Sequence, residues 1–445
     1  MVITGLGITR VLDGLEVTIV GAIGPRLEQS AGLGLSATQI GEAATAYLIG
    51  ATAGALVFGD LTDRFGRKRL FLITLALYMT TTLATALSWN FASFAIFRGL
   101  AGTGIGGEYA AINSAIDELI PSRHRGRVDL AINATWWLGT MLGALAALVL
   151  LDPRLVDPHL GWRLTFALGA VIAIGILFVR RALPESPRWL ALHERTSEAS
   201  RVLGAIEREV ARSAKLEPPG GKYVEYSPRR PRGFSAVART MLVRYPGRTF
   251  VALSLMISQA FLYNAIFFTE ALVLGTFFGI APGRIPLYLF PFAIGNLLGP
   301  FVLGPLFDSL GRKVMIPLTY GLSGVLLALT GWMFVAGMLN ATTLTAAWCV
   351  IFFFASAGAS SAYLTVSETF PLDSRAIAVA IVYAAGTLVG GAAAPSLFGV
   401  LVATRSAQAV FAGYLVAAGA MLAAALVERA FGVEAAQRML EDVAR

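Results

Sequence analysis

Several ionisable residues lie inside long apolar stretches, where a charge must either bind a proton or find a partner. Asp13 and Glu16 interrupt the first stretch, and Arg98 and Glu108 lie in the fourth. An ionised side chain at the centre of a membrane helix costs about 2.5–3.5 kcal/mol on insertion scales. Because intramembrane charges of this kind mark ion paths and proton relays, we predict that these four residues take part in proton coupling.

The depths of Glu16 and Arg98 agree with each other. At about 1.5 Å per residue, Glu16 lies roughly 21 Å from the start of its helix, and Arg98 roughly 10 Å below the outer edge. Protonation of Glu16, with Asp13 one turn deeper, would free Arg98 and shift the balance between two states; a permanent structural pair is the alternative. Glu108 is either a second relay or a helix-packing partner, and Glu270 is predicted to be solvated.

The four predicted proton-coupling residues lie in apolar stretches that are long enough to cross a bilayer. Of the 445 residues, 56% are hydrophobic and 14% are charged, whereas soluble proteins carry about 25% charged residues. A membrane helix needs about 20 mostly apolar residues. Twelve such stretches are present: 2–24, 38–58, 70–88, 91–115, 128–151, 162–180, 249–271, 285–306, 314–336, 342–364, 376–402 and 406–427.

The predicted fold class is therefore an all-α membrane protein with twelve transmembrane helices in two six-helix bundles. We place the first bundle at 1–181, a cytoplasmic linker with short helices at 182–248, the second bundle at 249–428 and a tail at 429–445. The tail after Glu428 is predicted to form a short amphipathic helix.

The basic residues set the orientation of the chain in the membrane. With the N-terminus inside, 28 of the 35 Lys and Arg residues fall in cytoplasmic segments and five in outer loops. This excess predicts a multi-pass protein of the cell (inner) membrane with both termini in the cytoplasm. It also explains the net charge of +8 without a nucleic-acid partner.

One loop motif occurs twice. The loop after the second stretch reads GDLTDRFGRK (59–68), and the loop after the eighth reads GPLFDSLGRK (304–313), 245 residues later. Glycines allow a tight turn between two helices. Asp63 and Asp308 come just ahead of the next helix, where its dipole favours a carboxylate.

A second motif repeats in the same order. Glu118 and Arg125 follow the fourth stretch, and Glu368 and Arg375 follow the tenth with the same spacing. Two motifs repeated at nearly constant offset indicate an internal duplication with parallel halves, related by a pseudo-two-fold axis. Their charges serve either as ion-pair latches or only as orientation signals.

These two loop motifs resemble the signature of the major facilitator superfamily. The segment PESPRWL (184–190) resembles one found in sugar porters, organic-ion transporters and metabolite–proton symporters. In the first helix, LDGLEVTIVGAIGP (12–25) is most similar to the aromatic-acid–proton symporters. The resemblance covers residues 8–427.

This resemblance implies a rocker-switch transporter with alternating access to a central cavity. It also implies a cytoplasmic gate that holds the inner side shut. The residues carried over to that gate are Asp63, Arg64, Arg67, Glu118, Arg125, Glu185, Arg188, Asp308, Arg312, Glu368 and Arg375.

Polar and aromatic residues within the other stretches are candidates for the lining of the substrate cavity, although such residues more often bridge helices. Trp136 and Trp137 point in different directions on a helix, so at most one of them is expected to face the cavity. The lining candidates are Asn133, Trp136, Gln259, Tyr263, Asn264, Asn296, Ser360 and Tyr383.

The pattern G-x-G-x-x-G at Gly102, Gly104 and Gly107 lies inside a membrane-length stretch. A dinucleotide site needs a preceding strand, so we attribute these glycines to close helix packing. The chain has no phosphate-binding loop of the G-x-x-x-x-G-K-S/T form and no His/Cys cluster. We therefore expect no cofactor, no metal, no ATP-driven transport and no enzymatic activity.

The function predicted from these features is secondary active transport of a small organic solute by a monomer in the lipid bilayer. Proton symport is the leading interpretation, and the resemblance suggests an organic acid as substrate. A drug–proton antiporter (exporter) and a transporter-like membrane sensor are the alternatives. A sensor should carry a folded output domain, and the linker and tail are short for one.

Overall fold

The structure, a computed structural model, describes residues 7–8, 10–11, 13–15, 23, 26–27, 29–119, 125–181, 185–213, 233–267, 270–280, 284–371, 375–436, 438 and 443. Within these residues the regular structure is helical and contains no strand. Eight of the described helices are long and apolar enough to cross a membrane.

The helices of the first half agree with the predicted stretches. The described residues between 7 and 27 are helical; those up to residue 23 belong to the first stretch, and residues 26 and 27 lie just beyond its predicted end. The helices that follow are α2 (Ala37–Phe65), α3 (Arg67–Ala86), α4 (Phe91–Leu119), α5 (Arg125–Leu150) and α6 (Pro158–Arg181).

The second half repeats this pattern with two differences. Its seventh stretch, 249–271, covers most of α10 and only the first two residues of α11, and its eleventh covers α15, a π-helical segment η4 and α16 to within one residue at each end. The helices are α10 (Pro246–Phe267), α11 (Glu270–Phe278), α12 (Ile285–Ser309), α13 (Arg312–Val335), α14 (Ala341–Thr369), α15 (Arg375–Ala385), η4 (Gly386–Gly391), α16 (Ala393–Ala403) and α17 (Ala407–Phe431).

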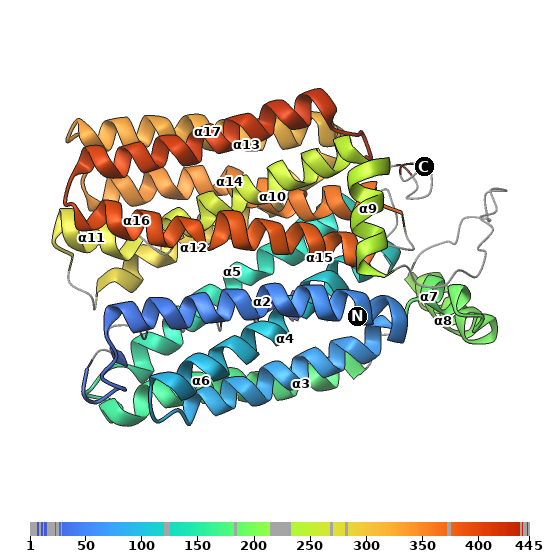
Figure 1. Cartoon of the computed structure of the whole chain (residues 1–445), viewed down its shortest axis with the longest axis horizontal. Helices are drawn as coiled ribbons and strands as arrows, with labels where there is room; N and C mark the ends of the chain where they lie inside the picture. Colours follow the sequence, from blue (N-terminus) through green and yellow to red (C-terminus); the bar gives the residue numbers. More distant parts are fainter. Residues whose placement is uncertain are drawn as a thin grey trace.

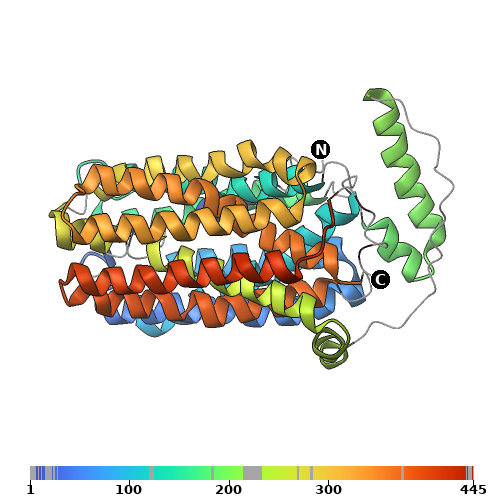
Figure 2. The same ribbon diagram turned by 90° about the horizontal axis from the view of Figure 1, so that it is seen from above.

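The two halves lie side by side, and three short helices mark one end of the bundle (Figure 1). These are α7 (Pro187–Leu192), α8 (Thr196–Ser213) and α9 (Phe234–Arg244). We call this the linker end and the opposite one the far end. Figure 2 shows α7 and α8, in green, projecting beyond the bundle.

The tail differs from its prediction over residues 432–436. These residues are not helical, whereas the sequence predicted an amphipathic helix after Glu428; Val443 is helical, and residues 437, 439–442 and 444–445 lie outside the described residues. Helix α17 ends at Phe431, and the backbone N–H of Gly432 donates to the carbonyl of Glu428 at 2.7 Å. The extended chain beyond it takes Glu434 back to the bundle, as described below.

Glycines turn the chain at both copies of the repeated motif. Gly66 separates α2 from α3 with φ of 94°, and Gly311 stands at the matching place before α13 with φ of 93°. Positive φ at these values strains a residue with a Cβ, so glycine is needed at each turn. The tight turns expected from the motif are confirmed.

Glycines also bring helices of the first half together. A Cβ on Gly102 would collide with the carbonyl of Tyr47, and one on Gly104 would come within 2.9 Å of the Thr74 carbonyl. Gly107 lies against Phe58, where a Cβ would come within 2.6 Å of the side chain. The G-x-G-x-x-G pattern is thus explained by packing of α4 against α2 and α3.

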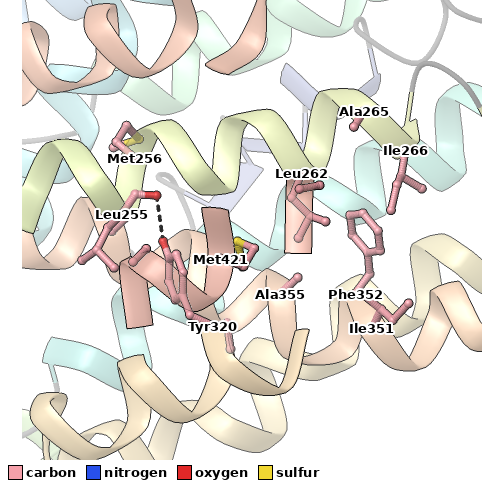
Figure 3. Packing of buried hydrophobic residues seen from close by; sticks show 14 of the residues in the cluster. Leu255, Met256, Leu262, Ala265, Ile266, Tyr320, Ile351, Phe352, Ala355 and Met421 are labelled. Carbon is pink, nitrogen blue, oxygen red and sulfur yellow. Dashed lines mark hydrogen bonds between the residues drawn. The ribbon is translucent and has the colours of Figure 1, made fainter. Parts of the chain in front are cut away.

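Helices from both halves build the interface between them. Helix α5 packs along α12, and α2 packs along α15. The large apolar core lies in the second half, and it includes Leu130 and Trp137 of α5. Figure 3 shows part of this core, where the Tyr320 hydroxyl donates to the Leu255 carbonyl at 3.1 Å.

Candidate functional site

A buried ion pair lies in the first helix. The Arg10 guanidinium is 3.4 Å from the Asp13 carboxylate, and both side chains are almost fully buried. One turn of helix separates them, so they share one face. Asp13 is one of the four predicted proton-coupling residues, and its partner Arg10 was not among them.

Two tyrosines of the second half lie near this pair. The hydroxyls of Tyr363 on α14 and Tyr383 on α15 both interact electrostatically with Arg10, and Tyr383 also does so with Asp13. The two phenol rings are 6.4 Å apart between centroids. The ion pair therefore lies at the interface between the halves, with an aromatic wall from α14 and α15.

Tryptophans of α5 extend the aromatic surface along the interface. The Trp137 ring lies 5.6 Å from Phe292 and 6.1 Å from Tyr263, measured between centroids. Trp136 and Trp137 both contact Phe267, at 6.0 and 5.9 Å. The sequence predicts that at most one of these tryptophans faces the cavity, which stays a prediction; both rings contact Phe267 of the other half.

Polar candidates on α10 and α12 are joined to each other. The Tyr263 hydroxyl donates to the Asn296 side-chain oxygen at 2.9 Å, and Asn296 is fully buried. The Gln259 amide approaches the Met256 sulfur at 3.1 Å. The Asn264 amide donates to the Ala260 carbonyl of its own helix at 2.7 Å.

The remaining lining candidates bond within their own helices. Asn133 donates to the Asp129 carbonyl at 3.0 Å, and Ser360 donates to the Ser356 carbonyl at 3.1 Å. Tyr383 hydrogen-bonds to Thr387 in η4. Such π-helical segments are often found at functional sites.

The other predicted proton-coupling residues are placed in part. Arg98 is buried, with its guanidinium 4.2 Å from the centre of the Tyr47 ring. Glu16, its predicted partner, lies outside the described residues, and so does the side chain of Glu108. The Glu16–Arg98 pair therefore stays a prediction.

At the linker end, three predicted gate residues form one buried network. The Arg312 guanidinium is 2.9 Å from Asp308 and 3.0 Å from Glu368. These three side chains are at most 8% exposed. The latch residues of the two repeated motifs thus meet inside the second half.

Asp308 also joins the two halves. Its carboxylate accepts hydrogen bonds from the backbone N–H groups of Gly126 and Arg127, at 3.1 and 3.0 Å. These groups belong to the first turn of α5, where a helix dipole favours an anion. The linker end is therefore closed between α5 and α12.

Glu185 and Glu434 occupy matching places in the two halves. Glu185 accepts from the backbone N–H of Lys68 at 3.2 Å, at the start of α3. Glu434 accepts from the N–H groups of Arg312 and Lys313 at the start of α13, at 3.0 and 3.2 Å. Sequence reasoning missed Glu434, although it follows Glu185 by 249 residues, close to the offset of the repeated motifs.

The described contacts of the other predicted gate residues do not include the network of Asp308, Arg312 and Glu368. The buried Arg375 donates to the Phe370 carbonyl at 3.2 Å, and Arg64 pairs with Asp60 near the surface at 2.8 Å. Arg188 lies partly buried at the start of α7. The side chains outside the described part of the chain are those of Asp63, Arg67, Glu118 and Arg125.

Within the described residues, no group of three or more His, Cys, Asp or Glu side chains could hold a metal ion. The ionisable groups around Arg10 are instead its own guanidinium, the carboxylate of Asp13 and the phenols of Tyr363 and Tyr383. Such groups can bind an anion, exchange a proton and stack on an aromatic ring.

Comparison with known proteins gives a family match over almost the whole chain. Residues 21–445 match the sequence model of the family described as "Sugar (and other) transporter".

Among curated proteins, the chain is similar to transporters of small organic molecules. It is 32% identical over 203 residues to the niacin transporter NiaP of Acinetobacter baylyi, covering 46% of this chain and 44% of that protein. It is 27% identical over 339 residues to the gallate transporter of Pseudomonas putida, covering 72% of this chain and 68% of that protein. The chain thus spans less than half the length of the niacin transporter.

Among solved structures, the chain is similar in fold to the proton:xylose symporter XylE of the major facilitator superfamily. The TM-score is 0.78 at 19% identity, with 99% of this chain and 97% of that chain covered. The inward-open conformation of XylE from E. coli gives a TM-score of 0.66, with 99% and 98% covered. The predicted fold of twelve helices in two bundles is confirmed.

Proposed function

Since the chain belongs to the sugar (and other) transporter family of the major facilitator superfamily, we propose that it carries a small organic acid together with a proton. Transport proceeds by alternating access to a site between the two halves. The observation that carries this proposal is the buried Arg10–Asp13 pair opposite Tyr363 and Tyr383.

This pair can couple a proton to an anion. A substrate carboxylate and the Asp13 carboxylate compete for the same Arg10 guanidinium. Protonation of Asp13 removes its charge and leaves Arg10 to bind the substrate, so proton and anion are bound together. A hydrogen bond to a charged group contributes about 1.5–3 kcal/mol, enough to favour joint binding over binding of the anion alone.

The aromatic surroundings support an aromatic acid as the substrate. Trp137 and Tyr263 line the interface beside Phe292, and aromatic rings bind one another in edge-to-face or offset contacts. Two of the relatives are named as transporters of niacin and of gallate, and both of these compounds are small aromatic carboxylic acids. The first helix also resembles that of aromatic-acid–proton symporters.

We further propose that the linker end faces the cytoplasm of the cell (inner) membrane, with both termini on that side, and that the protein acts as a monomer. The network of Asp308, Arg312 and Glu368 then forms the core of the cytoplasmic gate. Glu16, Arg98 and Glu108 remain proposed members of the proton path.

Ligand-induced stabilisation of the purified protein tests the substrate class. We expect nicotinate or gallate to raise the unfolding temperature, since a ligand at 100 times its Kd stabilises the native state by about 2.7 kcal/mol. Nicotinamide and xylose, which lack a carboxylate, should leave it unchanged. Stabilisation by xylose without any effect of the acids would contradict the proposal.

The role of Arg10 is tested in the same assay. Arg10→Gln removes the guanidinium, so we expect at least about tenfold weaker binding of the acid, from the loss of a charge-assisted hydrogen bond. Arg64→Gln is the matched control because Arg64 is half exposed and lies at the linker end. Equal affinities of Arg10→Gln and the unsubstituted protein would exclude Arg10 from the site.

A further inference from the structure

Glu270 is a fully buried carboxylate that is not among the residues of the proposed transport site. It is the first residue of α11, at the far end of the second half (Figure 1), and its exposure is 0%. The sequence-based expectation that Glu270 is solvated is therefore wrong. Counting residues along a helix gives depth, but it does not show which neighbouring helices cover the side chain.

Among the residues that the structure describes, none donates a hydrogen bond to Glu270 and none forms an ion pair with it. Both of its carboxylate oxygens are buried, and neither accepts a hydrogen bond from the residues that the structure describes. Among the described residues, Cys349 of α14 and Tyr414 of α17 interact with it electrostatically. Helix α16, which also packs on α11, has no ionisable residue, and neither has the turn of α13 that contacts Phe277 and Phe278 through Phe334.

This environment favours the neutral form of the carboxyl group. An ionised carboxylate that is taken out of water without donors or a counter-charge loses most of its solvation. The dipole at the start of α11 opposes this effect, but a helix terminus offsets only a small part of such a loss. The protonated acid is therefore the form that fits this enclosure.

Glu270 is also close along the chain to the contact between the halves. Phe267, three residues earlier, packs on Trp136 and Trp137 of α5. The linker end is closed by the bonds from Asp308 to α5. The two halves are thus in contact both at the linker end and at Phe267. In alternating access the far end opens only while the linker end is closed, and separation of Phe267 from α5 would then shift the start of α11.

We propose that Glu270 is a proton-binding site that controls closure of the far end. Its carboxyl group holds a proton while it lies buried beside Cys349 and Tyr414, and it releases that proton to water on the far side when α11 moves away. This inference rests on the alternating access of the proposed function but not on its proton-coupled accumulation.

The direction of the pH effect follows from this linkage. The closed far end binds a proton at Glu270, whereas a solvated carboxylate in the open far end is ionised near neutral pH. A state that binds protons more tightly gains population as the pH falls. Acid on the far side therefore favours closure, and alkali favours opening.

Infrared spectroscopy of the purified protein in lipid tests the protonation directly. At neutral pH we expect the carbonyl band of a protonated carboxylic acid, and we expect its loss in Glu270→Gln. Glu42→Gln is the matched control, because Glu42 is an exposed glutamate near the start of α2. Identical spectra of Glu270→Gln and the unsubstituted protein would overturn the proposal.

A distance measurement tests the control of closure. Spin-label amino acids at Leu155 and Met338, exposed at 67% and 59% in loops of opposite halves, report the opening of the far end. They leave Cys349 in place beside Glu270. We expect the distance to shorten as the pH falls, and Glu270→Gln to keep the short distance at every pH.

Glu42→Gln should keep the pH response of this distance. An unchanged pH response in Glu270→Gln would overturn the role of Glu270 in closure. If the unsubstituted protein failed to accumulate substrate in a pH gradient, the proposed proton symport would fail, while the infrared band and the distance shift would still stand.

Discussion

Arg312→Met is expected to lower the free energy of unfolding by about 3–5 kcal/mol, the range measured when one partner of a buried ion pair is removed. Arg312 is 1% exposed and lies between two carboxylates, Asp308 and Glu368. Without the guanidinium, two buried negative charges face each other with no counter-charge between them. Thermal unfolding of the purified protein measures the loss.

The first half offers a control for this substitution. Arg64 pairs with Asp60 at the same i,i+4 spacing, although it is not the counterpart of Arg312 in the repeated motif, and its side chain is 50% exposed. Exposed pairs contribute about 0–1 kcal/mol, so Arg64→Met should change the unfolding temperature little. Equal effects of the two substitutions would contradict a buried network at Arg312.

Asp13→Asn is expected to abolish accumulation of the substrate in a pH gradient while exchange of substrate across the membrane continues. With one proton per anion, one pH unit sustains about a tenfold concentration ratio, because 1.4 kcal/mol corresponds to tenfold. Asparagine cannot exchange a proton, so the ratio should fall to about one. Counterflow in proteoliposomes, with equal pH on both sides, measures the exchange that remains.

Asp129→Asn is the control for Asp13→Asn. Asp129 is a buried aspartate of α5 whose carboxylate accepts from Asn133 of its own helix at 3.2 Å. We expect this variant to keep the accumulation ratio. If Asp13→Asn accumulated substrate as well as Asp129→Asn does, the coupling proton would have to bind elsewhere, with Glu16 the next candidate.

The sequence was sufficient to predict the fold because membrane helices leave a strong local pattern. The apolar stretches predicted the positions of the helices, and the two repeated motifs predicted the division into two halves. The helices continue past the apolar stretches at the linker end, as α14 does to Thr369. A search for apolar residues therefore places the end of such a helix several residues too early.

The site was harder to predict because its contacts join distant helices. Asp13 was found from the cost of an intramembrane charge, but its partner Arg10 and the neighbouring Tyr363 depend on how the halves face each other. Glu434 lies in a tail with little local pattern and caps α13 from 122 residues away along the chain. Glu270 was misjudged because its cover comes from helices far along the sequence.

Uptake into proteoliposomes with an alkaline interior tests the central claim, proton symport of an organic acid, most directly. The substrate should be the aromatic acid that stabilises the purified protein, and protein-free liposomes correct for passive entry. We predict protein-dependent accumulation that rises about tenfold per pH unit and collapses when a protonophore is added. Protein-dependent uptake that ignores the pH gradient, or net export of the acid against it, would contradict the claim.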